Sequence, residues 1–173
     1  SNTDAGLSDL NKAIEMEEKF AKAYYNRGLA YLDLNNPDQA IADFTKAIEF
    51  NPEYTAAYCN RGVAYSDLGQ HSRAISDYSK AIELDPKFAG AYWNRGVVYY
   101  DLGQLPQAIS DYSKAIELDP KNAAAYCNRG VAYATLGKFE EAKKDLLKTV
   151  ELDPAQKPQV KKISDYFKLN LQL

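Results

Sequence analysis

The chain has 173 residues, of which 46% are hydrophobic and 26% are charged, the balance of a folded protein rather than a disordered one. Its 21 Lys and Arg residues and 24 Asp and Glu residues give a formal net charge of -3. A surface that binds the phosphate backbone needs clustered positive charge, so this composition disfavours nucleic acid as a partner. Apolar runs fall short of the ~18 residues that a membrane span needs, so direct membrane insertion is not expected either.

The sequence repeats itself every 34 residues. The tripeptide Asn-Arg-Gly occurs four times at this spacing, beginning at Asn26, Asn60, Asn94 and Asn128. Other residues that keep the same step are Tyr24, Tyr58, Tyr92 and Tyr126; Ala40, Ala74, Ala108 and Ala142; and Pro52, Pro86, Pro120 and Pro154. A fixed period of this length is typical of repeat proteins, in which each repeat packs on its neighbours.

Each repeat contains apolar residues at spacings of three and four, which predicts two amphipathic helices, here named helix A and helix B. In the second repeat, helix A is expected near 55–68 and helix B near 72–84. The motif Y-x3-G-x2-Y, followed by A-x3-[FY]-x2-A and a proline, resembles the tetratricopeptide repeat (TPR) family. The resemblance covers 21–154 and implies an all-α fold, a right-handed α-solenoid of stacked antiparallel helix pairs.

The predicted elements begin with a partial repeat. Residues 1–20 hold a tag remnant and, over 4–17, a lone helix B of a preceding repeat, because they continue the repeat register backwards. Four repeats are then expected, as one continuous domain, at 21–54, 55–88, 89–122 and 123–156. For the lone helix two interpretations stay open: the chain is a fragment of a longer array, or another chain covers its apolar face.

The last segment, 157–173, is expected to form a capping helix. Its apolar stripe falls at Val160, Ile163, Phe167 and Leu171, with lysines on the other side. Repeat arrays need such a helix to shield the last repeat from water. The alternative is that this helix docks on a neighbouring molecule.

Glycine and proline mark the ends of the helices and their closest approach. Gly69, Gly103 and Gly137 follow helix A, where a left-handed residue ends a helix, and Asn35 takes this place in the first repeat. A proline then ends each helix B. Glycines also stand inside helix A, where each costs about 1 kcal/mol relative to alanine. We expect helix B to approach at these positions, with its alanines facing the gap and the helix A tyrosines around it: Gly28, Gly62, Gly96 and Gly130.

Helix A lines the inner surface of a curved helix-pair array, so ligand contacts are expected on this helix. The residues expected to face this groove are Asn26, Asn60, Asn94, Asn128, Tyr25, Cys59, Trp93, Cys127, Leu29, Val63, Val97, Val131, Tyr100, Asp33, Asp67 and Asp101. The asparagine amides match the C=O and N–H groups of an extended peptide, and the TPR resemblance implies that they hold ligand main chain. The alternative is a hydrogen bond to a neighbouring helix. Trp93 is expected as an exposed hot spot, with a place in the core as the alternative.

The chemistry of the groove favours one class of ligand. Apolar and amide side chains predominate and aspartates lie at one rim, which suits an extended neutral or basic peptide. One TPR subclass binds acidic C-termini through a clamp of lysines and asparagines. The resemblance places Tyr25 and Gly90 at the lysine positions and Leu29 at an asparagine position, so an acidic chaperone tail is disfavoured.

Arginine and aspartate also recur at the 34-residue period, at Arg27, Arg61, Arg95 and Arg129 and at Asp9, Asp43, Asp77, Asp111 and Asp145. The pattern predicts ion pairs between each helix A and helix B of the preceding repeat, which set the register of the stack. The alternative is an anion-binding site built from the arginines.

Few residues are available for metal or catalytic chemistry. Cys59, Cys127 and His71 cannot supply a four-ligand zinc site by themselves, and His71 lies far from either thiol in sequence. Every glycine has a packing or capping role, which leaves none for a phosphate-binding loop. We therefore predict no metal, no cofactor and no enzymatic activity.

Together these features predict a non-catalytic protein–protein interaction scaffold that binds an extended peptide or partner segment through the asparagines and the apolar and aromatic side chains. The alternative is a self-assembly module, a homo-oligomer stacked end to end through its terminal helices. Free thiols favour a reducing interior such as the cytoplasm, although the sequence leaves the location open.

Overall fold

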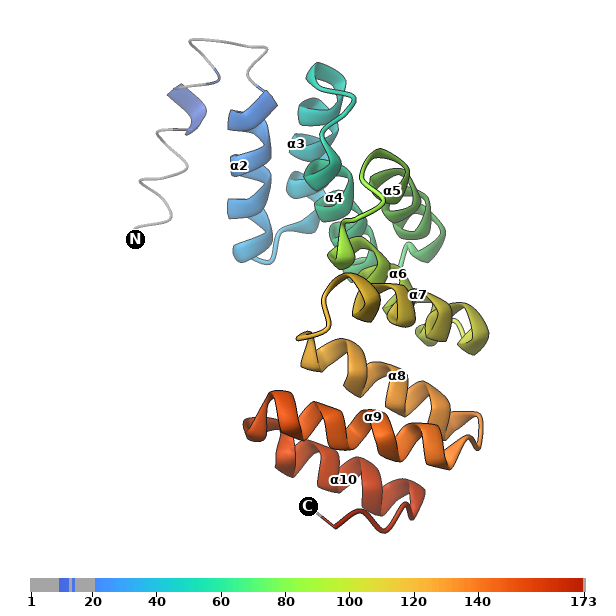
Figure 1. Cartoon of the computed structure of the whole chain (residues 1–173). Helices are drawn as coiled ribbons and strands as arrows, with labels where there is room; N and C mark the ends of the chain where they lie inside the picture. The colour runs from blue at the N-terminus through green and yellow to red at the C-terminus, as the bar shows by residue number, and fades with distance from the viewer. Residues whose placement is uncertain (1–9, 13, 15–20, 173) are drawn as a thin grey trace. The chain divides into compact units, whose positions relative to one another are not determined.

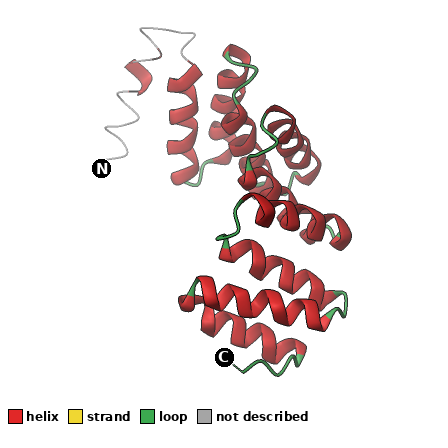
Figure 2. Cartoon of the chain, viewed as in Figure 1, coloured by secondary structure: helices red, strands yellow, loops and turns green. Residues whose placement is uncertain are grey.

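The computed structural model describes residues 10–12, 14 and 21–172, and every regular element within them is a helix (Figure 2). Consecutive helices pack as antiparallel pairs joined by short turns, which confirms the all-α class. The chain divides into two compact units, 1–86 and 87–173. The prediction that the repeats form one continuous domain therefore stays a prediction.

The first unit contains two helix pairs. They are α2 (Ala21–Asp33) with α3 (Pro37–Phe50), and α4 (Thr55–Asp67) with α5 (His71–Leu84) (Figure 1). α3 also packs on α4, and Ala40, Phe44 and Ala64 form a buried cluster between the pairs. Residues 10–12 and 14 are helical, and the rest of the helix expected over 4–17 lies outside the described residues.

The second unit contains two further pairs and a last helix. They are α6 (Ala89–Asp101) with α7 (Leu105–Leu118), α8 (Ala123–Thr135) with α9 (Phe139–Leu152), the short 3-10 helix η1 (Pro154–Gln156), and α10 (Lys157–Phe167). α7 packs on α8, and α8, α9 and α10 lie side by side (Figure 1). The helix bounds expected in the second repeat agree with α4 and α5 to within about one residue of each end.

The last helix covers the apolar face of the fourth pair. Val160 of α10 is fully buried in one cluster with Ala134 and Leu146, and Ile163 packs at its edge. The helix ends at Phe167, before the end of the predicted apolar stripe at Leu171. It ends there because Lys168 and Asn170 adopt a left-handed backbone conformation, with φ angles of 55° and 53°. This turn brings the buried Leu169 back onto the same cluster.

The glycines inside helix A mark the closest approach of each pair. A Cβ on Gly28, Gly62 or Gly96 would lie 2.7–2.8 Å from a ring carbon of the helix B aromatic. Those rings belong to Phe44, Tyr78 and Tyr112, so the helix B aromatic, rather than a helix A tyrosine, fills the space over the glycine. At Gly130 the corresponding residue is Leu146, whose Cγ would lie 3.1 Å away.

Left-handed residues end the first helix of each pair, as expected from the sequence. The φ angles are 54° at Asn35, 68° at Gly69, 71° at Gly103 and 74° at Gly137. Glycine adopts this conformation without the Cβ clash that other residues meet, and asparagine tolerates it. The same turn is therefore formed in all four repeats.

The arginines pair with the helix B of their own repeat, not with the preceding one. The four pairs are Arg27–Asp43, Arg61–Asp77, Arg95–Asp111 and Arg129–Asp145, with Nε–Oδ2 distances of 2.7–2.8 Å. In each pair, Nη2 of the arginine also donates to Oδ1 of the same carboxylate. The expected partner helix is therefore wrong, because the aspartate lies sixteen residues after its arginine.

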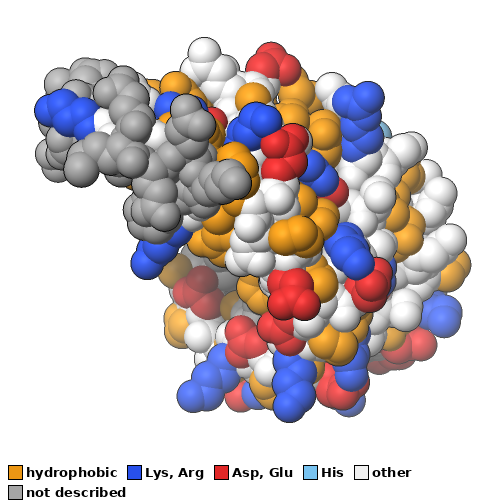
Figure 3. All heavy atoms as spheres, turned by 90° about the horizontal axis from the view of Figure 1, so that it is seen from above, with side chains coloured by type: hydrophobic (Ala, Val, Ile, Leu, Met, Phe, Trp, Pro, Cys, Tyr) orange, Lys and Arg blue, Asp and Glu red, His pale blue; other side chains and the backbone are white. Residues whose placement is uncertain are grey.

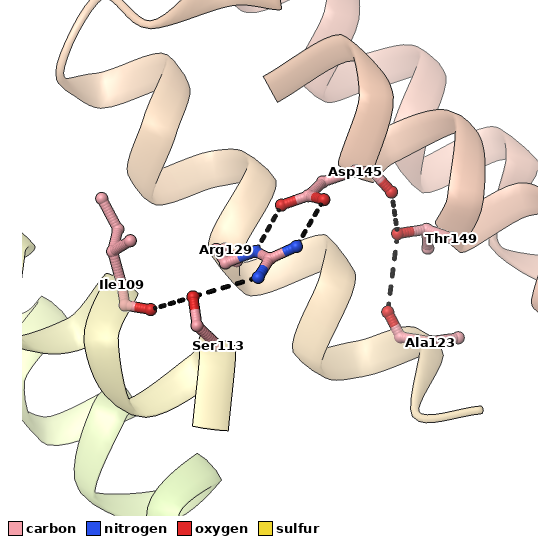
Figure 4. Close-up of polar contacts among 6 residues, drawn as sticks. All are labelled: Ile109, Ser113, Ala123, Arg129, Asp145 and Thr149. Atoms are coloured by element: carbon pink, nitrogen blue, oxygen red, sulfur yellow. Dashed lines mark hydrogen bonds and ion pairs between the residues drawn. The ribbon is translucent and has the colours of Figure 1, made fainter. Parts of the chain in front are cut away.

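The preceding helix B supplies a hydroxyl group to the same guanidinium. Nη1 of Arg61 donates to Thr45 Oγ1 at 3.0 Å. Nη1 of Arg129 donates to Ser113 Oγ, also at 3.0 Å (Figure 4). Ser113 Oγ donates in turn to the carbonyl oxygen of Ile109, at 2.7 Å. Each of these two guanidinium groups thus joins three helices and uses all three nitrogens within the fold, which disfavours the anion site.

The outer surface carries mixed charge. Lysine and glutamate residues three apart form exposed pairs on helix B: Lys46–Glu49, Lys80–Glu83, Lys114–Glu117 and Lys148–Glu151. Basic and acidic side chains are interspersed on the face shown in Figure 3. Over the described ranges, no helix has the length and apolar character that a membrane crossing requires.

Candidate functional site: a pocket on the first helices of the second unit

A pocket of about 220 Å³ lies between three helices of the second unit. Its lining residues are Val97, Tyr100, Asp101, Tyr112, Asn128 and Val131. α6 supplies the first three, α7 supplies Tyr112, and α8 supplies the last two. Five of the six were predicted from the sequence to face a ligand, and the structure brings these five together.

The repeat places equivalent residues of α6 and α8 on two sides of the pocket. Val97 and Val131 occupy the same position of consecutive repeats, and both are half-buried. The next residue along α6, Val98, is 1% exposed and belongs to the core. This contrast follows from helical geometry, because adjacent residues of a helix point to different sides.

Tyr112 is the pocket residue that sequence reasoning missed. Its side chain is 1% exposed, and it lines the pocket together with Asn128. Burial raises the pKa of this hydroxyl well above its ordinary value of 10.0, and the neighbouring Asp101 and Tyr100 raise it further. The phenol is therefore a neutral, polar group within an otherwise apolar wall.

Polar groups also lie at the end of α6. Asp101 is the last residue of this helix and is exposed. The hydroxyl oxygen of Tyr100 lies 3.5 Å from Thr135 Oγ1 of α8. Thr135 stands 34 residues after Asp101, so the fourth repeat has a neutral residue at the aspartate position.

The asparagines differ in what they contact. Nδ2 of Asn60 donates to the hydroxyl oxygen of Tyr25, at 2.9 Å, whereas Asn128 lines the pocket together with Tyr112. Phe44 takes the place of Tyr112 in the first repeat and has no hydroxyl group to offer Asn60. The Asn60 bond joins a neighbouring helix, the alternative considered for these residues.

An internal bond does not exhaust an asparagine side chain. An amide offers two N–H donors and an acceptor oxygen, so one internal hydrogen bond leaves groups that can meet a ligand. Asn26 is exposed, and Asn94 is half-buried. Ligand binding by the four asparagines therefore stays a prediction.

Trp93 and the cysteines are largely packing residues. Trp93 packs against the buried clusters around Tyr112 and Ile116, and its indole nitrogen is buried with no hydrogen-bond partner within the described part of the chain. Cys59 is 4% exposed, which corrects its assignment to the groove surface. Cys127 packs against the cluster covered by α10, and burial raises the pKa of its thiol, so it is a poor nucleophile.

In the first unit, the residues that were predicted to face the groove differ in their burial. Tyr25 and Leu29 pack against the cluster around Phe44, and the Tyr25 and Tyr54 rings lie 4.7 Å apart. Val63 is half-buried, and Asp33 and Asp67 are exposed. Within the residues that the structure describes, no group of three or more His, Cys, Asp and Glu side chains could hold a metal ion.

Comparisons with known proteins show the family to which the chain belongs. Family profiles described as "Tetratricopeptide repeat" match residues 21–54, 44–76 and 123–156, and one described as "TPR repeat" matches 64–103 and 98–137. The chain therefore belongs to the tetratricopeptide repeat family, a family of helical interaction scaffolds. A comparison with curated protein sequences gives no match.

Solved structures of similar fold span most of the chain. MamA is 27% identical with a TM-score of 0.82, and the match covers 90% of this chain and 91% of that chain. The first TPR of Spaghetti (RPAP3), bound to the HSP90 peptide SRMEEVD, is 29% identical with a TM-score of 0.66, covering 68% and 93%. YrrB, at 23% identity and a TM-score of 0.76, covers 93% and 84% and shows the shared fold.

Proposed function

We propose that the chain is a non-catalytic protein–protein interaction scaffold, and that it binds an extended neutral or basic peptide segment on its first helices. The pocket between α6, α7 and α8 is the observation that carries the proposal. Its apolar walls and its few polar groups are typical of sites that bind a ligand group through burial and orient it by hydrogen bonds.

The structure of RPAP3 with an HSP90 peptide supports a peptide as the type of ligand. That peptide, SRMEEVD, is acidic. The pocket of this chain instead has Asp101 at its edge and no lysine or arginine among its lining residues. We therefore infer a ligand without the acidic character of that peptide.

Asn128 is the residue that we assign to the ligand main chain. It lines the pocket together with Tyr112. A peptide that adds a hydrogen bond to this amide would gain main-chain recognition without dependence on its side chains, which suits an extended segment. Val97 and Val131 would supply apolar contact to the side chains on either side.

The proposal is tested with a phage-displayed library of random peptides, selected on the full-length chain. Selected peptides are then made synthetically, and their dissociation constants are measured by calorimetry. Asn128→Ala should weaken binding about tenfold, as expected for the loss of hydrogen bonds in a partly buried site. Circular dichroism should show unchanged helix content.

Two control variants separate ligand binding from packing. Ser110→Ala removes an exposed hydroxyl group of α7 outside the pocket, so it should leave affinity within about twofold. Lys144→Ala changes an exposed residue of α9 outside the pocket and should have no effect. The proposal fails if no peptide is enriched, or if the selected peptides bind Asn128→Ala as tightly as the parent chain.

A further inference from the structure

The polar groups of the pocket share one electrostatic character. Asp101 contributes a carboxylate, and it lies at the C-terminal end of α6, where unpaired carbonyl groups give the helix end a partial negative charge. Asn128 adds an amide whose oxygen is a hydrogen-bond acceptor. None of the six lining residues is basic. The pocket therefore favours a positively charged group that is rich in N–H donors.

The remaining walls suit a long side chain with an apolar stem. Val97 and Val131 are aliphatic, and Tyr100 and Tyr112 present aromatic rings. The volume of about 220 Å³ is below the range of about 300–1,000 Å³ that is typical of small-molecule sites. This space fits one side chain of a larger ligand better than a free cofactor.

We propose that this pocket binds the side chain of an arginine in a partner peptide, with its aliphatic stem between Val97 and Val131 and its guanidinium group at Asp101. The inference rests on the proposed function and specifies which residue of the peptide anchors it. A guanidinium group offers five N–H donors in a plane, which match a carboxylate in two parallel bonds and stack on aromatic rings. Lysine has a compact, strongly hydrated charge and meets fewer of these acceptors at once.

The pocket combines features that the other described repeats have only in part. The first repeat has Asp33 but carries Phe44 in place of the buried tyrosine. The second has Asp67 and Tyr78 but carries Ser66 in place of Tyr100, and the fourth carries Leu146 and Thr135. Asp33 is exposed at the end of α2, as Asp101 is at the end of α6. Asp33 is therefore a matched control for general attraction between a carboxylate and a cationic peptide.

The test compares two synthetic peptides on the full-length chain, Ac-Gly-Arg-Gly-NH2 and its citrulline counterpart. Citrulline keeps the shape of arginine but is neutral. Binding is followed by nitrogen-15 NMR, which reports a shift at each backbone amide. The arginine peptide should shift the amides of Val97, Asp101, Asn128 and Val131, and it should bind about fivefold or more tightly than the citrulline peptide.

Substitution of the carboxylate completes the test. Asp101→Asn should remove the difference between the two peptides, whereas Asp33→Asn should preserve it. Equal affinity of the parent chain for the two peptides would overturn the inference. This comparison uses the parent chain alone, so it does not depend on the folding of any variant. Shifts spread over exposed carboxylates, with no concentration at the pocket, would overturn it as well.

Failure of this inference is distinguishable from failure of the proposed function. Suppose that library peptides bind Asn128→Ala more weakly than the parent chain but keep their affinity when citrulline replaces their arginines. This result would contradict the arginine inference and still support a peptide-binding scaffold. If the library yields no binding peptide, the scaffold proposal itself fails.

Discussion

Gly96 shows how one residue sets both the packing of a helix pair and the shape of the pocket. A Cβ at this position would lie 2.8 Å from the Tyr112 ring, and Tyr112 lines the pocket. The glycine lets the ring lie directly against α6. The contact between Gly96 and the Tyr112 ring therefore both packs the helix pair and fixes the position of the pocket wall.

We predict that Gly96→Ala destabilises the chain by about 1–3 kcal/mol, because the clash with the ring exceeds the gain in helix propensity. Gly130→Ala should have a smaller effect, since Leu146 is a flexible aliphatic neighbour at 3.1 Å. Urea unfolding at equilibrium measures both changes. An equal loss in the two variants, or a gain at Gly96, would contradict the contact described here.

The buried tyrosine also predicts a pH dependence. The pKa of Tyr112 is raised above 10.0 in the folded chain, mainly by burial. Above a pH of about 10 the unfolded chain releases this proton while the folded chain keeps it, so the stability that Tyr112 contributes is present below that pH and is lost above it. The stability difference between the parent chain and Tyr112→Phe should therefore shift against the parent between pH values of about 8 and about 11. A constant difference in urea unfolding would show that Tyr112 titrates normally.

Residue roles could be predicted from the sequence only where one helix determines them. Val97, Val131 and Asn128 repeat on one side of helix A, and this periodicity indicated the pocket wall. The position of Tyr112 in the pocket wall depends on contact between a helix B and the next helix A. The periodicity of the sequence does not reveal this contact. Trp93 is half-buried and packs on two clusters that only the folded chain brings together, so its contact with a ligand stays a prediction.

At the scale of the elements, Arg61 and Arg129 each join a helix pair to the one before it within the same unit. Arg129 bonds Asp145 in its own pair and Ser113 in the preceding pair (Figure 4). The period alone could not separate these partners, because each arginine has one aspartate after it and another before it at similar separations. The structure assigns the carboxylate to the same repeat and the hydroxyl group to the preceding one.

We predict that Ser113→Ala costs about 1 kcal/mol of stability, because Nη1 of Arg129 loses its acceptor in a partly buried place. Ser110→Ala makes the same chemical change at an exposed position of α7 and should be nearly neutral. Thermal or urea unfolding of the two variants compares them directly. Equal stability of both would show that the hydroxyl group does not hold the pairs together.

The capping helix makes a further prediction at this scale. Val160 is fully buried against the fourth pair, whereas Tyr166 of the same helix is 81% exposed. Val160→Ala should destabilise the chain by about 1–2 kcal/mol, through lost burial and a small cavity. Tyr166→Ala should change stability by less than about 0.5 kcal/mol. Similar losses in both variants, measured by urea unfolding, would contradict the packing of α10 on α8 and α9.

At the scale of the molecule, most of the fold could be predicted from the repeat period. It predicted the number of helix pairs, their turns and the helix after the last pair, because each depends on local sequence and on contact with the next repeat. The ligand depends on a pocket assembled from three helices, and its chemistry became visible only when Tyr112, Asp101 and Asn128 were brought together.

The most direct test of the account is an isotope-edited NOE measurement between a library-selected peptide and the methyl groups of the full-length chain. The account predicts intermolecular NOEs to the methyl groups of Val97 and Val131. It predicts none to Leu147, an exposed leucine on α9 outside the pocket. NOEs to Leu147 without any to the two valines would contradict the claim that the first helices of the repeats bind the partner.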